Sequence, residues 1–173
     1  MIIMLNGTFG VGKTTIAAAL QQHLPRAVIF DPESVGTLVR NLMNGVRTGS
    51  EDTDDFQDIL LWRSLTTATA KGLYEQYGRP LIIPMTLVHP DCLTTIHSAL
   101  AQIALVRHFC LQAPLAVIRE RLLERGDDVD EWAWRQSQQY MPRFRDARYA
   151  QHIDTEHRNI EAIVGDILLS IAS

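Results

Sequence analysis

The stretch Gly7-Thr8-Phe9-Gly10-Val11-Gly12-Lys13-Thr14 fits the pattern G-x-x-x-x-G-K-[ST] at every fixed position. An apolar run at 2–5 precedes it, and apolar residues at helical spacing follow it over 16–24. A strand, a glycine turn and a helix form the context in which this pattern binds phosphate, because glycines let backbone N–H groups face inward and a helix N-terminus carries partial positive charge. We call residues 7–14 the phosphate loop; the alternative is an ordinary glycine-rich turn. The spacing differs from G-x-G-x-x-G, which disfavours a dinucleotide-binding fold.

The pattern assigns chemistry to individual residues of the loop. The Lys13 ammonium is expected to reach the β- and γ-phosphates, and the Thr14 hydroxyl is expected to bind Mg²⁺. The expected cofactors are therefore ATP and Mg²⁺, with Thr14 as the metal ligand that the pattern identifies. The residues predicted to bind the nucleotide through this segment are Gly7, Thr8, Phe9, Gly10, Val11, Gly12, Lys13, Thr14 and Thr15.

Length and composition describe an ordinary globular chain. The 173 residues are 46% hydrophobic and 21% charged, which predicts a single domain over 1–173. A net charge of −4 argues against a non-specific nucleic-acid binder, and no apolar run reaches the ~18 residues of a transmembrane segment. The chain opens directly into an apolar run without a signal peptide, and Cys92 and Cys110 lack C-x-x-C spacing. We therefore expect reduced, buried thiols and a cytoplasmic location; the sequence leaves the oligomeric state open.

Apolar runs and helical patterns alternate along the chain. This alternation predicts a three-layer α/β fold, a five-stranded parallel sheet with helices on both faces and its active edge at the carboxyl ends of the strands. A polar loop is expected at 44–55, and the one-sided apolar stripe over 160–171 is expected to pack on the sheet, the alternative being a membrane-surface helix. The expected strands are 2–6, 27–30, 81–85, 106–111 and 152–154, and the expected helices are 13–24, 32–43, 55–77, 90–103, 114–125, 130–147 and 160–171.

Asp31 closes the second expected strand, so its carboxylate is predicted to face the phosphates across the edge of the sheet. There it could accept a proton from an acceptor hydroxyl or hold Mg²⁺ through water. The alternative is a cap for the following helix, and the two roles are compatible. The third expected strand runs into Pro84-Met85-Thr86 without Asp or Glu, so a second protein contact for the metal is not identified.

Arg121 and Arg125 lie four residues apart just before Gly126, so they share one face of a helix end. We expect both to contact the nucleotide beside a lid segment over about 126–135, with Arg125 neutralising charge on the transferring phosphoryl group. The alternative is that they pair on the surface with Glu120 and Glu124.

A third group is expected on the side of the phosphoryl acceptor. Thr86 follows the third strand, and Arg40, Trp62 and Arg63 lie on the helices expected before that strand. Either arginine would contact the acceptor or be solvated, and Trp62 would line the acceptor site or belong to the core. His89 lies in a loop, where it is a ligand or base, or an ordinary loop histidine.

Five short motifs occur in order over residues 1–112. They are Gly7-x-Phe9-Gly10-x-Gly12-Lys13-Thr14, Asp31-Pro32-Glu33, Asp55-Phe56-Gln57, Leu61-Trp62-Arg63 and Pro84-Met85-Thr86-x-Val88-His89-Pro90. In these motifs the chain resembles the ATP-binding tunicamycin resistance proteins, within the P-loop nucleotide and small-molecule kinases. The remaining third resembles the broader nucleotide-kinase pattern, in which Arg121 would lie against adenine and Arg125 on phosphate. The acidic segment after Gly126 departs from the arginine-rich lid of adenylate kinases.

The resemblance implies a P-loop kinase fold and an ATP-binding protein that protects against tunicamycin, a uridine- and sugar-containing antibiotic with a lipid tail. Such an acceptor needs an apolar groove beside a polar pocket, with Phe56, Leu60, Trp62 and Met85 as candidate walls. Three functions stay open: phosphorylation of a hydroxyl of tunicamycin or a related nucleoside-sugar, ATP-dependent sequestration without chemistry, and a small-metabolite kinase of gluconate or shikimate type. The residues given catalytic roles are Lys13, Asp31 and Arg125, and those expected to contact the acceptor are Asp31, Arg40, Phe56, Trp62, Arg63, Met85 and Thr86.

Overall fold

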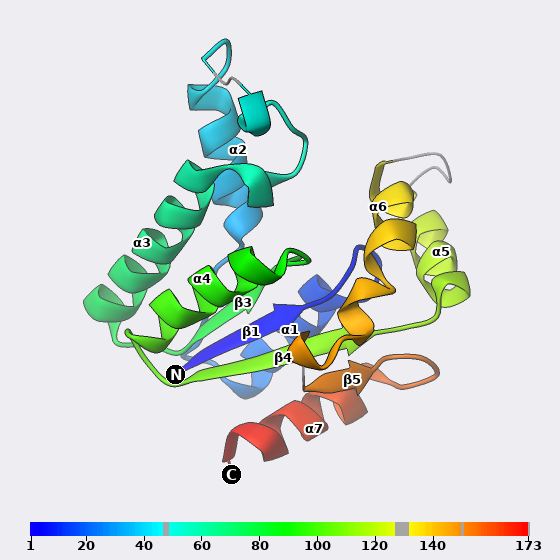
Figure 1. The fold of residues 1–173 in the computed structure, drawn as a ribbon. Helices are drawn as coiled ribbons and strands as arrows, with labels where there is room; N and C mark the ends of the chain where they lie inside the picture. The colour runs from blue at the N-terminus through cyan, green and yellow to red at the C-terminus, as the bar shows by residue number, and fades with distance from the viewer. Residues whose placement is uncertain (47–48, 127–131, 150, 173) are drawn as a thin grey trace.

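Five short apolar strands form the parallel sheet that the sequence pattern predicts. The structure, a computed structural model, describes residues 1–46, 49–126, 132–149 and 151–172. The strands described there are β1 (Ile2–Asn6), β2 (Val28–Ile29), β3 (Leu81–Pro84), β4 (Val106–Gln112) and β5 (His152–Asp154), in the order β2-β3-β1-β4-β5. Because every neighbouring pair is parallel, the carboxyl ends of the strands meet at one edge of the sheet (Figure 1).

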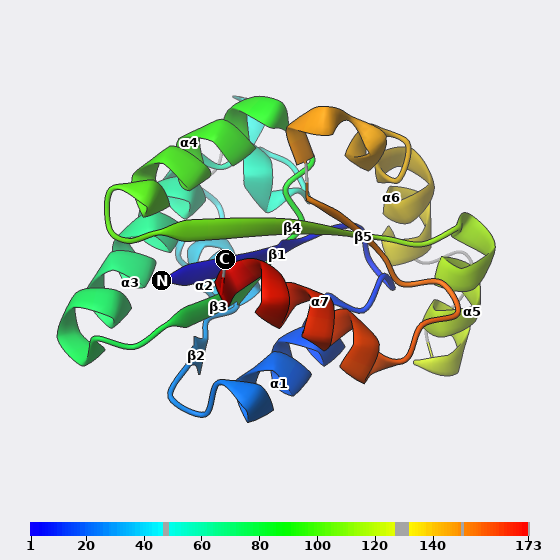
Figure 2. The same ribbon diagram turned by 90° about the horizontal axis from the view of Figure 1, so that it is seen from below.

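Helices cover both faces of the sheet, because the side chains of β1 alternate between two buried layers. The described helices are α1 (Lys13–His23), α2 (Pro32–Leu42), α3 (Leu60–Tyr77), α4 (Pro90–Ala101), α5 (Leu115–Glu124), α6 (Trp132–Tyr140) and α7 (Ile160–Ala172). Ile2 and Met4 pack with residues of α3 and α4, whereas Ile3 and Leu5 pack with residues of α1 and α7. Figure 2 shows these helices on opposite sides of the sheet. The three-layer fold is confirmed, and the apolar stripe of α7 packs on the sheet.

Two helix boundaries differ from the sequence prediction, each for a local reason. The helix predicted from residue 55 begins at Leu60, because the Asp55 carboxylate accepts a backbone N–H two residues further on (2.9 Å) and a 3-10 turn precedes α3. The helix predicted over 130–147 ends at Tyr140. Pro142 has no N–H with which to continue that helix, so shorter 3-10 turns follow it.

The predicted lid over 126–135 falls largely on residues 127–131, which lie outside the described part of the chain. Before it, Gly126 follows α5 with φ +94, a left-handed conformation that favours glycine. After it, α6 begins at Trp132. In the described residues, both cysteines are buried and free, and none of the helices has the length and hydropathy of a membrane span.

Candidate active site

The phosphate loop turns from β1 into α1, and two of its glycines cannot be replaced without strain. Gly7 has φ +139, and a Cβ atom there would lie 2.7 Å from the carbonyl oxygen of Leu111. Gly10 has φ +72, and a Cβ atom there would lie 2.9 Å from the Cγ of Leu122. The loop leads into the first turn of α1 at Lys13, where the backbone N–H groups have no helical partner. This geometry is that of an anion-binding loop.

The Lys13 ammonium lies within the curve of the phosphate loop. It donates hydrogen bonds to the carbonyl oxygens of Gly7 (3.0 Å) and Thr8 (2.9 Å). Burial lowers the pKa of Lys13 to about 8, and the shift is opposed chiefly by the carboxylate of Glu33 and more weakly by that of Asp31. An anion bound by the loop would therefore favour the charged form of Lys13.

A cavity of about 910 Å³, called the phosphate cavity below, opens at the loop. Ligand pockets commonly measure about 300–1,000 Å³, so a nucleotide is of suitable size. The cavity is lined by Thr14 and Asp31, whose oxygen atoms are the donor type that Mg²⁺ prefers. The phosphate cavity is also lined by Glu33, Arg121, Arg125, Thr155 and Arg158.

Two carboxylates follow β2, and they have different surroundings. The Asp31 carboxylate accepts the N–H of Glu33 (2.9 Å) and so caps α2, while Asp31 also lines the phosphate cavity. Glu33, which the sequence analysis missed, lines both the phosphate cavity and the cavity beside it. Burial raises the pKa of Glu33, Asp31 adds to the rise, and Lys13 opposes it. Pro32 marks the position of Glu33 in the sequence, because a proline at N1 sets the start of the helix and places the next residue in its first turn.

The two predicted arginines of α5 both line the phosphate cavity. Arg121 donates to the hydroxyl (2.9 Å) and the carbonyl (2.8 Å) of Thr155, and to the carbonyl of Val11 (3.3 Å). Arg121 therefore joins the phosphate loop to the segment after β5. The alternative expectation was that it pairs with a glutamate on the surface. Arg125 follows α5, and its N–H donates to the carbonyl of Arg121 (3.1 Å). Their contact with a nucleotide stays a prediction.

A second cavity, of about 500 Å³, adjoins the phosphate cavity and is called the acceptor cavity below. Phe9, Glu33, Pro84 and Trp132 line both, so the two cavities meet beside the phosphate loop. Asp31, in contrast, lines only the phosphate cavity of the two. The residues of the predicted acceptor side that line the acceptor cavity are Arg40, Phe56, Trp62, Met85 and Thr86.

An aromatic stack forms part of the wall of the acceptor cavity. The rings of Phe56 and Trp62 stack with centroids 6.2 Å apart, and the Arg40 guanidinium lies over the Phe56 ring at 4.4 Å. Trp62 is 3% exposed and donates its ring N–H to the Pro32 carbonyl (3.0 Å), so it serves both the core and the cavity. Arg40 also donates to the carbonyl of Asp54 (3.1 Å).

Arg63 and Leu60, both predicted on the acceptor side, do not line the acceptor cavity. Leu60 is 65% exposed. The Nε atom of Arg63 donates to the carbonyl of Gln57 (2.6 Å), so its position supports the turn before α3. The prediction assumed a continuous helix from residue 55, whereas the 3-10 turn changes the direction in which side chains near the start of α3 point.

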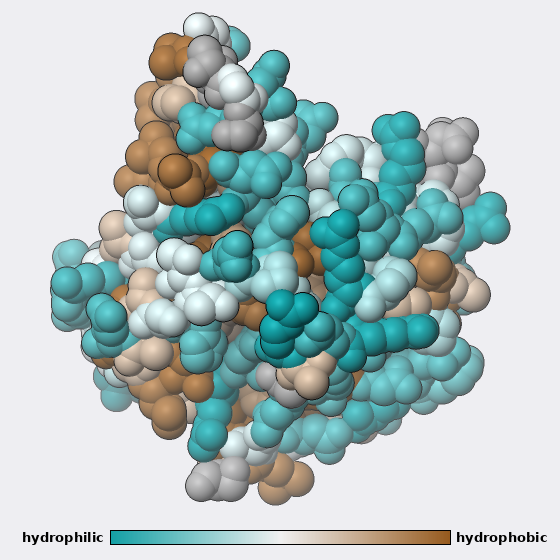
Figure 3. Space-filling model, in the orientation of Figure 1, coloured by the Kyte–Doolittle hydropathy of each residue, from teal (hydrophilic) through white to brown (hydrophobic). Residues whose placement is uncertain are grey.

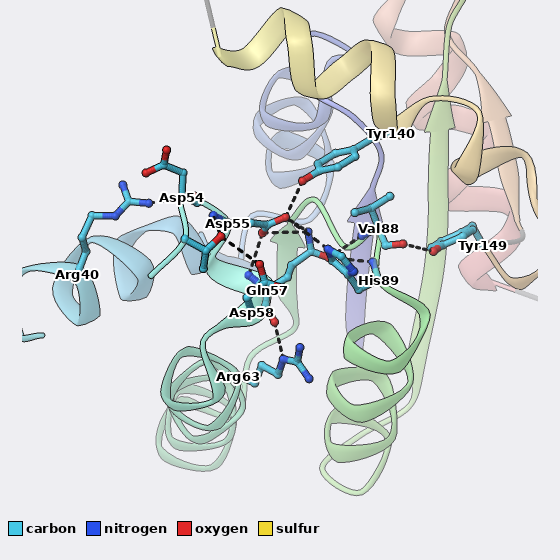
Figure 4. Close-up of polar contacts among 11 residues, drawn as sticks. Arg40, Asp54, Asp55, Gln57, Asp58, Arg63, Val88, His89, Tyr140 and Tyr149 are labelled. Carbon is cyan, nitrogen blue, oxygen red and sulfur yellow. Dashed lines mark hydrogen bonds and ion pairs between the residues drawn. The ribbon is translucent and has the colours of Figure 1, made fainter. Parts of the chain in front are cut away.

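Gln57 is the centre of a buried hydrogen-bond network beside the acceptor cavity (Figure 4). Its side-chain oxygen accepts the N–H groups of Val88 (2.7 Å) and His89 (3.0 Å), and its amide donates to Asp55 (3.1 Å). Asp55 also accepts the hydroxyl of Tyr140 from α6 (2.6 Å) and lies 3.6 Å from the His89 ring. The network therefore joins three segments, the turn before α3, the loop after β3 and helix α6.

Helix α6 contacts both halves of the site. The Trp132 ring meets the Phe9 ring edge-on with centroids 4.8 Å apart, and the Ser137 hydroxyl donates to the Phe9 carbonyl (3.2 Å). At the other end of the helix, Tyr140 donates to Asp55. The helix that follows the predicted lid is thus attached to the phosphate loop and to the wall of the acceptor cavity.

Helix α2 presents two different sides. Glu33, Thr37 and Arg40 recur at helical spacing and line the acceptor cavity. Leu38 and Leu42, on the same helix, are 52% and 66% exposed and do not line that cavity. Figure 3 shows a hydrophobic surface at its upper left, where α2 lies in Figure 1. The polar side of α2 therefore forms one wall of the acceptor cavity.

A phosphate loop at the centre of a parallel sheet, with a second cavity beside it, defines a P-loop kinase-like protein, a fold that implies nucleotide binding. The chain belongs to the AAA domain family, which matches residues 2–144. It is similar to the solved tunicamycin resistance protein of Deinococcus radiodurans, with 27% identity and a TM-score of 0.78 over 99% of this chain and 95% of that chain. The resemblance seen in the sequence motifs is confirmed.

Kinases named for other substrates have the same fold. A gluconokinase from Sinorhizobium meliloti is 15% identical, with a TM-score of 0.68 over 98% of this chain and 90% of that chain. A shikimate kinase from Acinetobacter baumannii, solved in complex with shikimate, is 16% identical, with a TM-score of 0.63 over 99% and 92%. At these identities the likeness concerns the fold alone. A comparison with curated protein sequences gives no match.

Proposed function

We propose that this protein phosphorylates a hydroxyl group of tunicamycin or of a related nucleoside-sugar, with ATP as the phosphoryl donor. The observation that carries the proposal is that Glu33 lines both the phosphate cavity and the acceptor cavity. A carboxylate at this junction lies where an acceptor hydroxyl would lose its proton as it attacks phosphorus. The similarity to the Deinococcus radiodurans protein supports tunicamycin as the acceptor, and the buried free thiols support a cytoplasmic location.

The phosphate cavity would hold the triphosphate through the backbone N–H groups of the loop and through Lys13. Arg125 would neutralise charge at the transferring group, and Arg121 would support the loop from the side of β5. Thr14 would bind Mg²⁺ directly and Asp31 through water, because the Asp31 carboxylate also caps α2. When bound, the metal would neutralise negative charge between the phosphates.

In the transfer, the acceptor oxygen forms a bond to the γ-phosphorus while the bond from that phosphorus to the bridging oxygen of ADP breaks. The proton of the hydroxyl passes to a carboxylate, for which Glu33 and Asp31 are the candidates. We expect Glu33→Gln to lower turnover about 10²–10⁴-fold with little change in ATP affinity, which is the usual contribution of a general base. Full turnover in this variant, together with lost turnover in Asp31→Asn, would assign the base to Asp31.

ATP-dependent sequestration of tunicamycin without chemistry is the second candidate. It is favoured by the end of β3, where Pro84, Met85 and Thr86 supply no carboxylate for a second metal contact. In that case the protein would bind antibiotic and ATP together without turnover.

Mass spectrometry of tunicamycin incubated with the protein and Mg-ATP separates the two candidates. Phosphorylation adds one phosphoryl group to the antibiotic and forms ADP in equal amount. Lys13→Ala is the control, since this change alters the phosphate cavity and leaves the lining of the acceptor cavity intact. Unmodified tunicamycin retained by the protein only in the presence of ATP would establish sequestration, and neither result would reject both candidates.

A further inference from the structure

The acceptor cavity is rich in negative charge. Among the described residues that line it, Glu33, Asp54 and Asp55 are carboxylates, and Arg40 is the single basic side chain. The other basic side chains of the site, Lys13, Arg121, Arg125 and Arg158, line the phosphate cavity and not the acceptor cavity. The charged side chains that line the acceptor cavity itself are therefore net negative.

The guanidinium of Arg40 is already engaged by neighbouring groups. It lies over the Phe56 ring, and one of its terminal nitrogens donates to the carbonyl of Asp54. Its Nε atom is buried without a partner in the described structure, as is the hydroxyl oxygen of Thr86. These two groups supply single hydrogen bonds to a ligand, whereas capture of an anion usually uses a bidentate guanidinium or several cations.

Aromatic side chains supply much of the remaining wall. Phe9, Phe56, Trp62, Trp132 and Tyr140 all line the acceptor cavity. Flat rings pack against apolar or planar parts of a ligand, while carboxylates accept hydrogen bonds from its hydroxyl groups. The cavity combines both kinds of group.

We infer that the acceptor cavity selects an uncharged, hydroxylated acceptor with a planar or apolar ring face, and that it rejects acceptors carrying a carboxylate or phosphate. The inference rests on the proposed function for the identity of this cavity as the acceptor site. An anionic group in this cavity would meet three carboxylates and one guanidinium, that of Arg40, which neighbouring groups already engage. Gluconate and shikimate are carboxylates, so the inference disfavours a kinase of gluconate or shikimate type.

Tryptophan fluorescence tests the charge of the cavity without a known acceptor. Trp132 is 37% exposed and lines both cavities, and Trp134→Phe removes a nearby background signal. At low ionic strength, Glu33→Gln/Asp54→Asn should raise quenching by iodide at least about twofold, because repulsion of the anion is relieved. Quenching by neutral acrylamide should stay unchanged.

The matched control is Glu75→Gln/Asp91→Asn, which changes the net charge equally at residues that line neither cavity. Iodide quenching that rises equally in both double variants would overturn the inference. Calorimetry with protein saturated by a non-hydrolysable ATP analogue then compares uridine with uridine 5′-monophosphate, and tighter binding of the monophosphate would also overturn it. Charge discrimination without phosphoryl transfer would reject the proposed function alone, whereas transfer without discrimination would reject this inference alone.

Discussion

Gln57→Leu removes the side chain that joins the turn before α3 to the loop after β3, beside the acceptor cavity. Leucine has a similar volume, so the loss is mainly polar: the N–H groups of Val88 and His89 lose their acceptor, and Asp55 loses a donor. Gln57 is 2% exposed and Val88 is 0% exposed, so water does not readily replace the lost partner. At about 1–3 kcal/mol for each buried unpaired group, with the His89 site only partly buried, the free energy of unfolding should fall by about 2–4 kcal/mol. For a chain of this length the melting temperature should then fall by about 4–16 °C.

Urea unfolding and calorimetry of Gln57→Leu measure this loss directly. The control is Gln76→Leu, the same substitution at an exposed position of α3, which should stay within about 0.5 kcal/mol of the parent protein. If Gln57→Leu loses no more stability than Gln76→Leu, the network does not hold these segments together, and the reasoning is refuted.

Gln57→Glu separates the charge of the network from its shape. The new carboxyl keeps an acceptor for Val88 and His89 but places a second negative charge beside Asp55. Repulsion and burial should raise the pKa of the new carboxyl in the folded protein, so the folded state binds its proton more tightly than the unfolded state. Compared with the parent protein at the same pH, the variant should regain stability as the pH falls from 7 to 5. A deficit that is equal at both pH values would assign the loss to shape instead.

Other parts of the site give three further predictions. Lys13→Ala should weaken ATP binding about 10–100-fold in calorimetry, because charge-assisted hydrogen bonds are lost, and unchanged affinity would reject the phosphate-loop assignment. Gly36→Ala places a Cβ atom 2.5 Å from the Phe56 ring, so acceptor affinity should fall while ATP affinity is kept; Gly72→Ala, in open space on α3, is the control and should leave both affinities unchanged. Burial lowers the pKa of His108 to about 4 from 6.5, and the effect is reinforced by His97 and His152. The unfolded state therefore binds the proton first, and the free energy of unfolding should fall by about 2 kcal/mol between pH 8 and pH 5. Urea unfolding at both pH values should show a smaller decrease for His108→Leu, and an equal decrease would remove His108 as the cause.

Much of the fold could be predicted because its signals are local. The phosphate loop specifies a strand, a turn and a helix within one continuous segment, and strands buried on both faces appear as short apolar runs. The predictions failed where one side chain changed the backbone. The Asp55 carboxylate replaces the first turn of a helix by a 3-10 turn, and Pro142 ends α6 early. Neither effect alters the hydrophobic periodicity on which the helix boundaries were based.

The two cavities differ in how far the sequence could predict them. Six residues that line the phosphate cavity, at positions 9–14, belong to one motif, so this part of its lining could be named from spacing alone. The acceptor cavity is assembled from α2, the turn before α3, the end of β3 and α6, and the contact between Asp55 and Tyr140 spans 85 positions. Hydrophobic periodicity along the sequence does not predict a contact between residues so far apart in the chain. Glu33 was missed for a different reason, because Asp31 at the end of the strand had already been assigned the role of the carboxylate at the phosphates.

The separate origin of the two cavities has a consequence for how acceptors are distinguished on this fold. Similarity to a gluconokinase and a shikimate kinase concerns the fold alone, so it carries no information about the acceptor. The acceptor meets instead the polar side of α2, where Glu33, Thr37 and Arg40 project into the cavity one helical turn apart. The cap at Asp31 fixes the start of α2 beside the phosphate cavity, and the side chains of these three positions take no part in that cap. If the proposed function holds, we therefore expect a change of charge on this side of α2 to alter which acceptors bind, without any change in the phosphate loop.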